Sequence, residues 1–164
     1  MKNILITGFI GNKNSSKILL DNLIKNINMD YLYLENDFEI SEKQLKDKLK
    51  HNKYDIIFAF GQKPVIKSIY IEKTAKNGNK NLETKYNYIK LKHFLDNYIK
   101  NKISENAGNY LCNNIYYKGL EYIKIKKLET EMIFIHVPYV KNMDIKYLCK
   151  IFNIYMKNIL GNNI

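Results

Sequence analysis

Three side chains that together could carry out nucleophilic amide chemistry are spaced along the chain: Glu72, Cys112 and His136. A cysteine attacks a carbonyl carbon, an imidazole takes the proton of the thiol, and an acid on the other ring nitrogen fixes the orientation of the imidazole. Each of the three lies at the start or end of an expected helix or strand. They therefore define a hypothesis of cysteine hydrolase chemistry, which requires the fold to bring them together.

Cys112 lies at the start of an expected helix, about Tyr110–Lys124. The free amides and the dipole of a helix N-terminus favour a thiolate, so we expect a lowered thiol pKa there, and the same amides could hold an oxyanion. The competing interpretation is a buried, inert cysteine, which is the commoner case for a cysteine taken alone. We assign that inert role to Cys149, in the middle of the last expected helix, about Asp144–Leu160.

His136 and Glu72 each follow an apolar segment of the chain. His136 ends the segment Met132–Ile135, and Glu72 follows Ile69–Ile71. Binding sites of α/β folds form beyond the carboxyl ends of their strands, so His136 is the best placed of the three histidines. A hydrogen-bonded structural histidine and a solvated glutamate are the alternatives. We consider Glu72 because it could accept a hydrogen bond from the imidazole and so orient the ring.

Segments of strand-like composition alternate with segments of helical periodicity along the whole chain. We expect strands at Lys2–Thr7, Tyr31–Leu34, Tyr54–Phe60, Val65–Ile71 and Met132–Val137. We expect further helices after Asn14-Ser15-Ser16, from a capping box of Ser41 and Gln44, and over Tyr86–Ile99, with a turn or loop at Asn77–Asn81. This order predicts an α/β protein: a three-layer α/β/α sandwich with a mainly parallel (mixed) central sheet, in a single domain over residues 1–164.

Charge and hydropathy narrow the classes of partner. The formal net charge is +11, but the chain contains no arginine and its lysines are spread throughout, which argues against nucleic acid as a partner. The longest apolar runs fall far short of the ~20 residues that span a bilayer, and the first residues do not form a signal peptide. We therefore expect a cytoplasmic protein, away from membranes, with both cysteines as free thiols.

The candidate residues lie in segments that resemble a known family. Residues 107–113, Ala-Gly-Asn-Tyr-Leu-Cys-Asn, resemble the cysteine motif of pyroglutamyl-peptidase I, a family also called pyrrolidone-carboxylate peptidase. Phe134–Pro138 resembles the histidine motif of this family, and Gly61-Gln62 with Glu72 resembles its glutamate segment. Thr7-Gly8-Phe9 is similar to its first loop, and Asn14-Ser15-Ser16 to the Asn-Pro-Ser that follows. The resemblance covers nearly the whole chain, in the family order Glu, Cys, His.

This resemblance implies a cysteine peptidase that removes an N-terminal pyroglutamyl residue from peptides through a thioester. It implies no metal and no organic cofactor, and family members often form homo-oligomers. The catalytic residues would be Glu72, Cys112 and His136. The residues implied near the lactam-binding pocket are Phe9, Gln62, Tyr110 and Leu111.

The chain also departs from the family pattern. Phe9-Ile10-Gly11 lacks a second phenylalanine and a Gly-Gly pair, Leu82 stands where the family has an arginine, and only Asn77–Glu83 remains of a long segment that contains proline. These losses keep three alternatives open. They are the same Cys-His-Glu chemistry on another small amide, a relative that has lost activity, and a basic nucleic-acid-binding module.

Overall fold

The computed structural model describes residues 2–161 of the chain. The helices are α1 (Ser15–Asn26), α2 (Phe38–His51), α3 (Tyr88–Asp96), α4 (Leu111–Ile125) and α5 (Ile145–Ile159). The strands are β1 (Ile4–Phe9), β2 (Asp30–Leu34), β3 (Ile56–Lys63), β4 (Ile69–Glu72), β5 (Thr74–Asn77), β6 (Lys80–Glu83), β7 (Asn101–Ser104) and β8 (Glu131–Pro138).

Six of these strands form one sheet in the order β2-β1-β3-β8-β4-β7. All neighbouring pairs in it are parallel except β4 and β8, which run antiparallel. Strands β5 and β6 form a separate antiparallel hairpin. The prediction of a mainly parallel, mixed sheet is confirmed.

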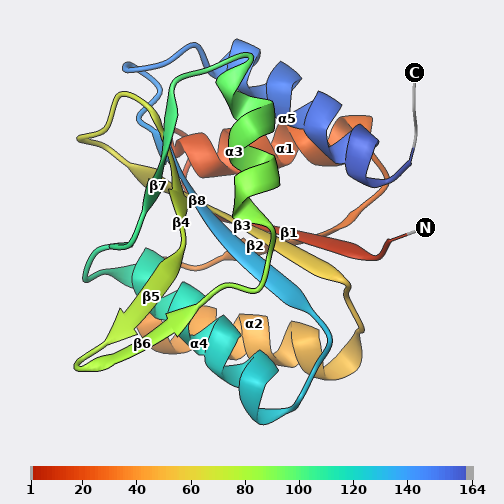
Figure 1. The fold of residues 1–164 in the computed structure, drawn as a ribbon, viewed down its shortest axis with the longest axis vertical. Helices are drawn as coiled ribbons and strands as arrows, with labels where there is room; N and C mark the ends of the chain where they lie inside the picture. The colour runs from red at the N-terminus through yellow and green to blue at the C-terminus, as the bar shows by residue number, and fades with distance from the viewer. Residues whose placement is uncertain (1, 162–164) are drawn as a thin grey trace.

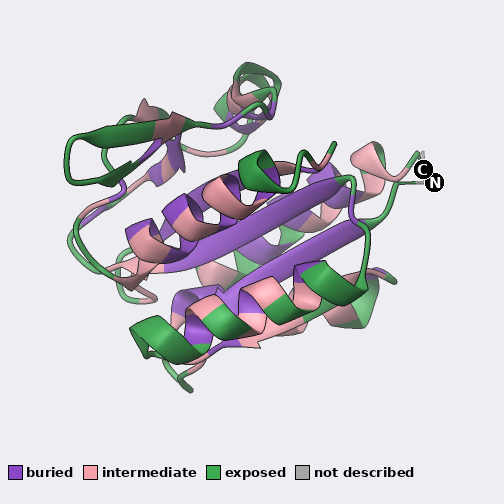
Figure 2. Ribbon diagram, turned by 90° about the horizontal axis from the view of Figure 1, so that it is seen from below, coloured by how far each residue is buried: buried purple, intermediate pink, exposed green. Residues whose placement is uncertain are grey.

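Helices cover both faces of the sheet, with α1, α3 and α5 on one side and α2 and α4 on the other (Figure 1). The side chains of β3 show why: Ile56, Phe58 and Phe60 pack with the first group of helices, whereas Ile57 and Ala59 pack with the second. Successive residues of a strand point to opposite faces, so a strand that is apolar at every position requires cover on both. Figure 2 shows the buried strands between the two helical layers, which confirms the three-layer sandwich.

The expected start of α2 is wrong. Asp37, and not Ser41, caps this helix, since its side chain accepts a hydrogen bond from Ile40 N. Ser41 is buried inside the first turns and donates to the Asp37 carbonyl oxygen, and Gln44 instead accepts from Glu35 N. An equally good capping residue four positions earlier lets the helix begin sooner.

The short strands are the other departure from expectation. The turn at Asn77–Asn81 is present, with Gly78 at φ 57°, but strands β5 and β6 flank it. Strand β7 was not expected, and β4 is shorter than the expected Val65–Ile71, whose Val65 is 84% exposed. Four-residue strands are too short to show an alternating pattern in the sequence.

Candidate active site

A pocket of about 510 Å³ lies where the carboxyl ends of β1, β3 and β8 meet the start of α4. Six of the seven residues singled out in the sequence line it: Phe9, Gln62, Tyr110, Leu111, Cys112 and His136. The fold therefore gathers residues that are widely separated in sequence at the edge of the sheet where α/β proteins build their sites.

Glu72, the seventh residue, holds His136 from within the protein. His136 Nδ1 lies 2.7 Å from Glu72 Oε1, and the side chains are 3% and 0% exposed. In the antiparallel β4–β8 pair, Glu72 lies opposite Phe134, two positions before His136 and so on the same face of the sheet. A carboxylate only accepts hydrogen bonds, so Nδ1 carries the proton and Nε2 is left as the basic nitrogen of the ring.

Cys112 is the second residue of α4, and its sulfur lies against the backbone of Gly61. A methyl group added to Gly61 would lie 2.6 Å from Cys112 Sγ. In the parallel β3–β8 pair Gly61 is the register partner of His136, and register partners on strands ~4.8 Å apart project to the same face. Cys112 and His136 therefore lie on one face of the sheet and line one pocket. Within residues 2–161 no hydrogen bond joins them, and catalytic contacts often tighten only when a substrate binds.

The electrostatics of the thiol contradict our expectation. Burial, and then the negative charge of Glu72, raise the pKa of Cys112 to about 12, while Lys63 acts in the opposite direction. The expected lowering by the helix N-terminus is therefore wrong, because desolvation of the thiolate is the larger effect. The resting sulfur is a protonated thiol, and a base must take its proton for the sulfur to attack.

The start of α4 also offers hydrogen-bond donors. Tyr110, the N-cap residue, makes no side-chain hydrogen bond to the first turn. The first amides of a helix have no partner within the helix, so those beside Cys112 can hold an oxyanion. Tyr110 itself is 75% exposed, and its ring centroid lies 6.2 Å from that of Phe38.

Cys149 occupies a different environment. It is 4% exposed and packs in the core that α1, α3 and α5 form against the sheet. Burial raises the pKa of its thiol to about 11. It is not among the residues that line the candidate pocket, so the two cysteines differ in access to a substrate.

Sequence reasoning missed two contributors to the site. Lys63 lines the pocket and is the cation that favours the Cys112 thiolate, but nothing in the sequence distinguishes it from the other lysines. The space required above Gly61 was also missed. A glycine that ends an apolar strand next to a motif residue is the signal that could have revealed it.

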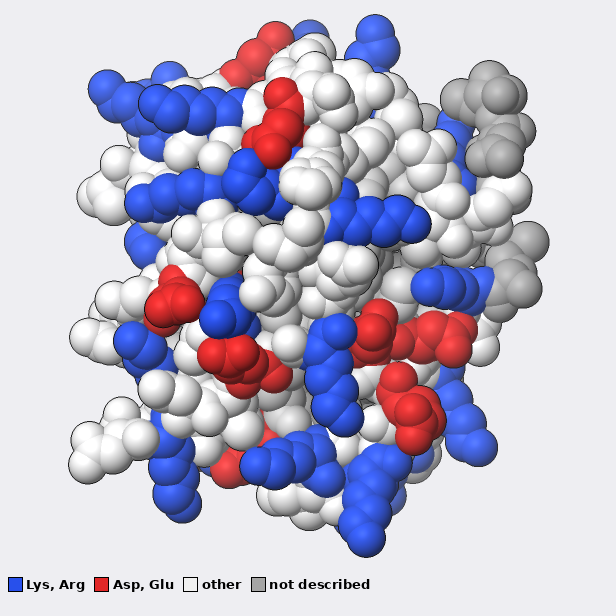
Figure 3. Space-filling view, in the orientation of Figure 1, with Lys and Arg blue, Asp and Glu red and all other residues white. Residues whose placement is uncertain are grey.

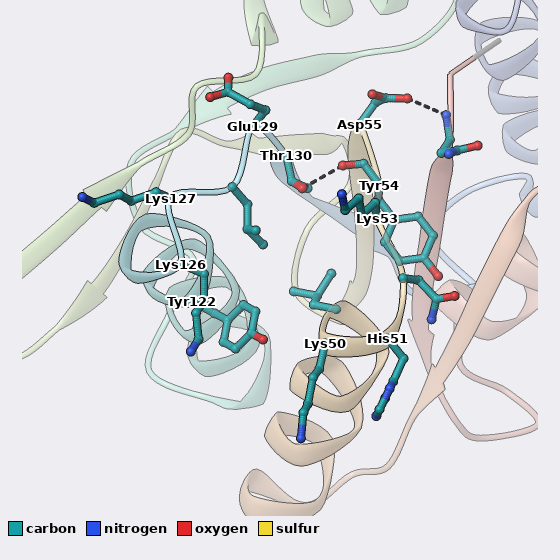
Figure 4. A pocket seen from close by; sticks show the side chains of 14 residues that line it. Lys50, His51, Lys53, Tyr54, Asp55, Tyr122, Lys126, Lys127, Glu129 and Thr130 are labelled. Atoms are coloured by element: carbon teal, nitrogen blue, oxygen red, sulfur yellow. Dashed lines mark hydrogen bonds between the residues drawn. The ribbon is translucent and has the colours of Figure 1, made fainter.

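A larger pocket, about 680 Å³, lies at the opposite end of the sheet (Figure 4). It is lined by residues that precede β1, β3 and β8 and by the last residues of α2 and α4. In Figure 4 the ends of the Lys50, Lys126 and Lys127 side chains lie apart and do not converge on one point. Basic side chains are favourable at helix C-termini, which accounts for their presence, and no cysteine lines this pocket.

The charges on the surface and the apolarity of the helices concern two classes of partner, nucleic acid and membranes. On the face in Figure 3, acidic side chains lie among the lysines, so no continuous basic surface forms there. Among the helices of residues 2–161, none has the length and apolarity needed to cross a membrane.

Comparisons with known proteins agree with the geometry. A family model described as pyroglutamyl peptidase matches residues 88–152, a span that includes Cys112 and His136. The pyrrolidone-carboxylate peptidase of Brachyspira hyodysenteriae is 29% identical over 144 residues, which cover 74% of this chain and 72% of that protein.

Solved structures share the fold. The pyrrolidone carboxyl peptidase of Fervidobacterium islandicum AW-1 matches with a TM-score of 0.88 at 20% identity, over 98% of this chain and 99% of that chain. That of Thermococcus litoralis matches with a TM-score of 0.79 at 22% identity, over 96% and 92%.

The chain shares the α/β/α fold of solved pyrrolidone carboxyl peptidases, and its residues 88–152 match the pyroglutamyl peptidase family model. The resemblance to the pyroglutamyl-peptidase family that the motifs indicated is confirmed: the chain is similar to these enzymes in sequence and in fold.

Proposed function

We propose that the chain is a cysteine peptidase that removes an N-terminal pyroglutamyl residue from peptides. The observation that carries this proposal is the buried contact of 2.7 Å between Glu72 and His136, on the same face of the sheet as Cys112. An acid buried with an imidazole orients the ring, and the shared pocket gives that ring access to a nucleophile.

The reaction has two halves. Cys112 Sγ attacks the carbonyl carbon of the pyroglutamyl residue while His136 Nε2 takes the thiol proton, and the amides at the start of α4 hold the oxyanion. The C–N bond then breaks as His136 returns the proton to the leaving amine, which leaves a thioester on Cys112. A water molecule, deprotonated by His136, attacks the thioester, and the thiol leaves with that proton to release pyroglutamate.

The other assignments follow from the resemblance and from the pocket lining. Phe9, Gln62, Tyr110 and Leu111 form the walls that receive the lactam ring. Residues 1–164 act as one catalytic domain, with a homo-oligomer as the proposed assembly. The reducing cytoplasm, which keeps the thiol free, is the proposed compartment.

The direct test is release of a chromophore from a pyroglutamyl substrate. Cys112→Ala should abolish turnover, whereas Cys149→Ala, the matched control, should leave it near the native rate. Iodoacetamide should inactivate the protein by labelling Cys112 in preference to Cys149, as peptide mass spectrometry would report. Full activity in folded Cys112→Ala would exclude the proposal.

A second candidate function is the same chemistry on another small amide. It is favoured by the shortened segment Asn77–Glu83 and by Leu82 at the position of the family arginine. Ready alkylation of Cys112 together with no turnover of pyroglutamyl substrates, but turnover of another N-terminal amide, would support it.

A further inference from the structure

A lysine, Lys63, lines the candidate pocket together with Cys112 and His136. It is the last residue of β3 and follows Gly61, the register partner of His136, by two positions. Alternate residues of a strand project to the same face, so the Lys63 side chain lies on the face of the sheet that carries Cys112 and His136. Its charge is therefore part of the site in which the proposed reaction takes place.

The ring of Tyr70 marks where the Lys63 ammonium group lies. Strand β8 separates β3 from β4 in the sheet, and Tyr70 on β4 is the register partner of His136. Lys63 Nζ is 5.3 Å from the centroid of the Tyr70 ring, a distance at which an aromatic face attracts a cation. The two side chains therefore meet across β8. Phe9, a proposed wall for the lactam ring, comes instead from β1, on the other side of β3.

Among residues 2–161, no acidic side chain forms an ion pair with Lys63. Glu72, the acid on the same face of the sheet, is bonded to His136. A second cation adds to the field, because Lys102 Nζ on β7 lies 4.1 Å from the centroid of the same Tyr70 ring. The β4 side of the pocket therefore attracts an anion.

We infer that Lys63 binds a carboxylate on the residue that follows pyroglutamate in the substrate, so that acidic pyroglutamyl peptides are preferred. The inference deepens the proposed function and rests on it. His136 returns its proton to the leaving amine, so the leaving residue begins beside His136, on the side to which Lys63 points. Its carboxylate is either an acidic side chain or the free C-terminus of a dipeptide.

Pairs of substrates that differ in charge test the inference and separate the two sources of the carboxylate. Pyroglutamyl-alanine and its amide differ in the C-terminal carboxylate, whereas the α-amide of pyroglutamyl-glutamate and pyroglutamyl-glutaminamide differ in the side chain. For the native protein, kcat/KM should be about tenfold higher for the acid than for its matched amide, through KM more than kcat. This ratio of acid to amide should fall toward one in about 1 M NaCl, because salt screens exposed charges.

Lys63→Met should bring the ratio of acid to amide to about one. Lys63 also favours the Cys112 thiolate, so this variant slows both substrates, and only the ratio reports carboxylate binding. Lys102→Met is the matched control, since it removes a cation over the same ring that does not line the pocket, and it should keep most of the ratio. Lys63→Glu should instead favour pyroglutamyl-lysinamide over pyroglutamyl-alaninamide. Thermal melting checks that all three variants fold.

Binding to Cys112→Ala, measured by calorimetry, separates this inference from the proposed function. Either acid should bind about tenfold more tightly than its amide, and adding Lys63→Met should remove the difference. Absence of binding, equal affinities in both pairs, or a difference that Lys63→Met retains would overturn the role of Lys63, even where native turnover upholds the peptidase. A difference that depends on Lys63, with no turnover by the native protein, would uphold that role and reject the peptidase.

Discussion

Gly61→Ala should displace the proposed nucleophile while leaving its chemistry intact. The added methyl would lie 2.6 Å from Cys112 Sγ and 2.7 and 2.9 Å from two ring carbons of Phe134. Phe134 is fully buried, so its ring has little room to move. Gly61 itself is held in the β3–β8 ladder opposite His136. The sulfur, which borders the pocket, can move away from the methyl, whereas the overlap with the Phe134 ring remains and destabilises the fold.

The size of the effect follows from these contacts. Ordinary contacts between such atoms are about 3.5–4.0 Å, so the sulfur must shift by about 1 Å. A misplacement of about 1 Å at a reacting centre costs about 10²-fold in rate. Overpacking a core costs about 1–3 kcal/mol of the free energy of unfolding. We therefore expect a folded, moderately destabilised protein with kcat reduced about 10²-fold.

Gly119→Ala is the matched control for this experiment. Its methyl would lie 2.4 Å from Met132 Sδ and 2.9 Å from Met132 Cε, which also form a crowded site on α4. Both atoms belong to the flexible end of the Met132 side chain, away from the candidate pocket. Alanine also favours the helix over glycine by ~1 kcal/mol. Urea unfolding and chromophore release would be measured for both variants. A folded Gly61→Ala with native kcat would refute the placement of Cys112, and equal losses in both variants would assign the effect to packing.

Three further predictions concern the thiol, its neighbouring charge and the hairpin. The pKa of Cys112 is raised to about 12, so the fraction of thiolate should still be rising between pH 7 and pH 10. Stopped-flow labelling with iodoacetamide should therefore show an alkylation rate that rises over this range without a plateau. Glu72→Gln should lower kcat by about 10²-fold or more, since the amide can donate to His136 Nδ1 and so favour the wrong tautomer, and since it carries no charge to stabilise an imidazolium. The same change should not slow alkylation, because the Glu72 charge disfavours the thiolate; slower alkylation would indicate a preformed ion pair. Asn113→Ala removes the two hydrogen bonds, 2.9 and 2.8 Å, that join α4 to the backbone of Lys76, and should cost about 1–3 kcal/mol in urea unfolding, whereas Asn114→Ala should cost little.

The architecture could be predicted wherever apolar residues are continuous over a long segment. The sequences of β3 and β8 predict buried strands because both of their faces are apolar. The helices are predicted by the 3.6-residue period of their apolar residues. The short strands β5, β6 and β7 could not be predicted, since four residues carry no readable period. The wrong cap of α2 has a similar cause: Asp37 and Ser41 are both good caps, and only tertiary packing buries Ser41 within the helix.

The candidate site was predictable in position but not in its electrostatics. His136 ends an apolar strand segment, so the carboxyl edge of the sheet was the expected place for it, whereas Glu72 reaches His136 from β4, which runs antiparallel to β8. The pKa of Cys112 depends instead on how deeply α4 seats the sulfur against Gly61 and Phe134, which no local pattern reports.

The same charge has two opposed effects on the proposed catalysis. Glu72 fixes the proton on His136 Nδ1 and so creates a base at Nε2, but its negative charge also raises the pKa of the Cys112 thiol. These effects are compatible only if the proton moves from sulfur to imidazole during the attack. The imidazolium formed in that step then neutralises the field of Glu72 at the moment when the sulfur carries charge. A resting site with a neutral thiol is therefore the state that this arrangement favours.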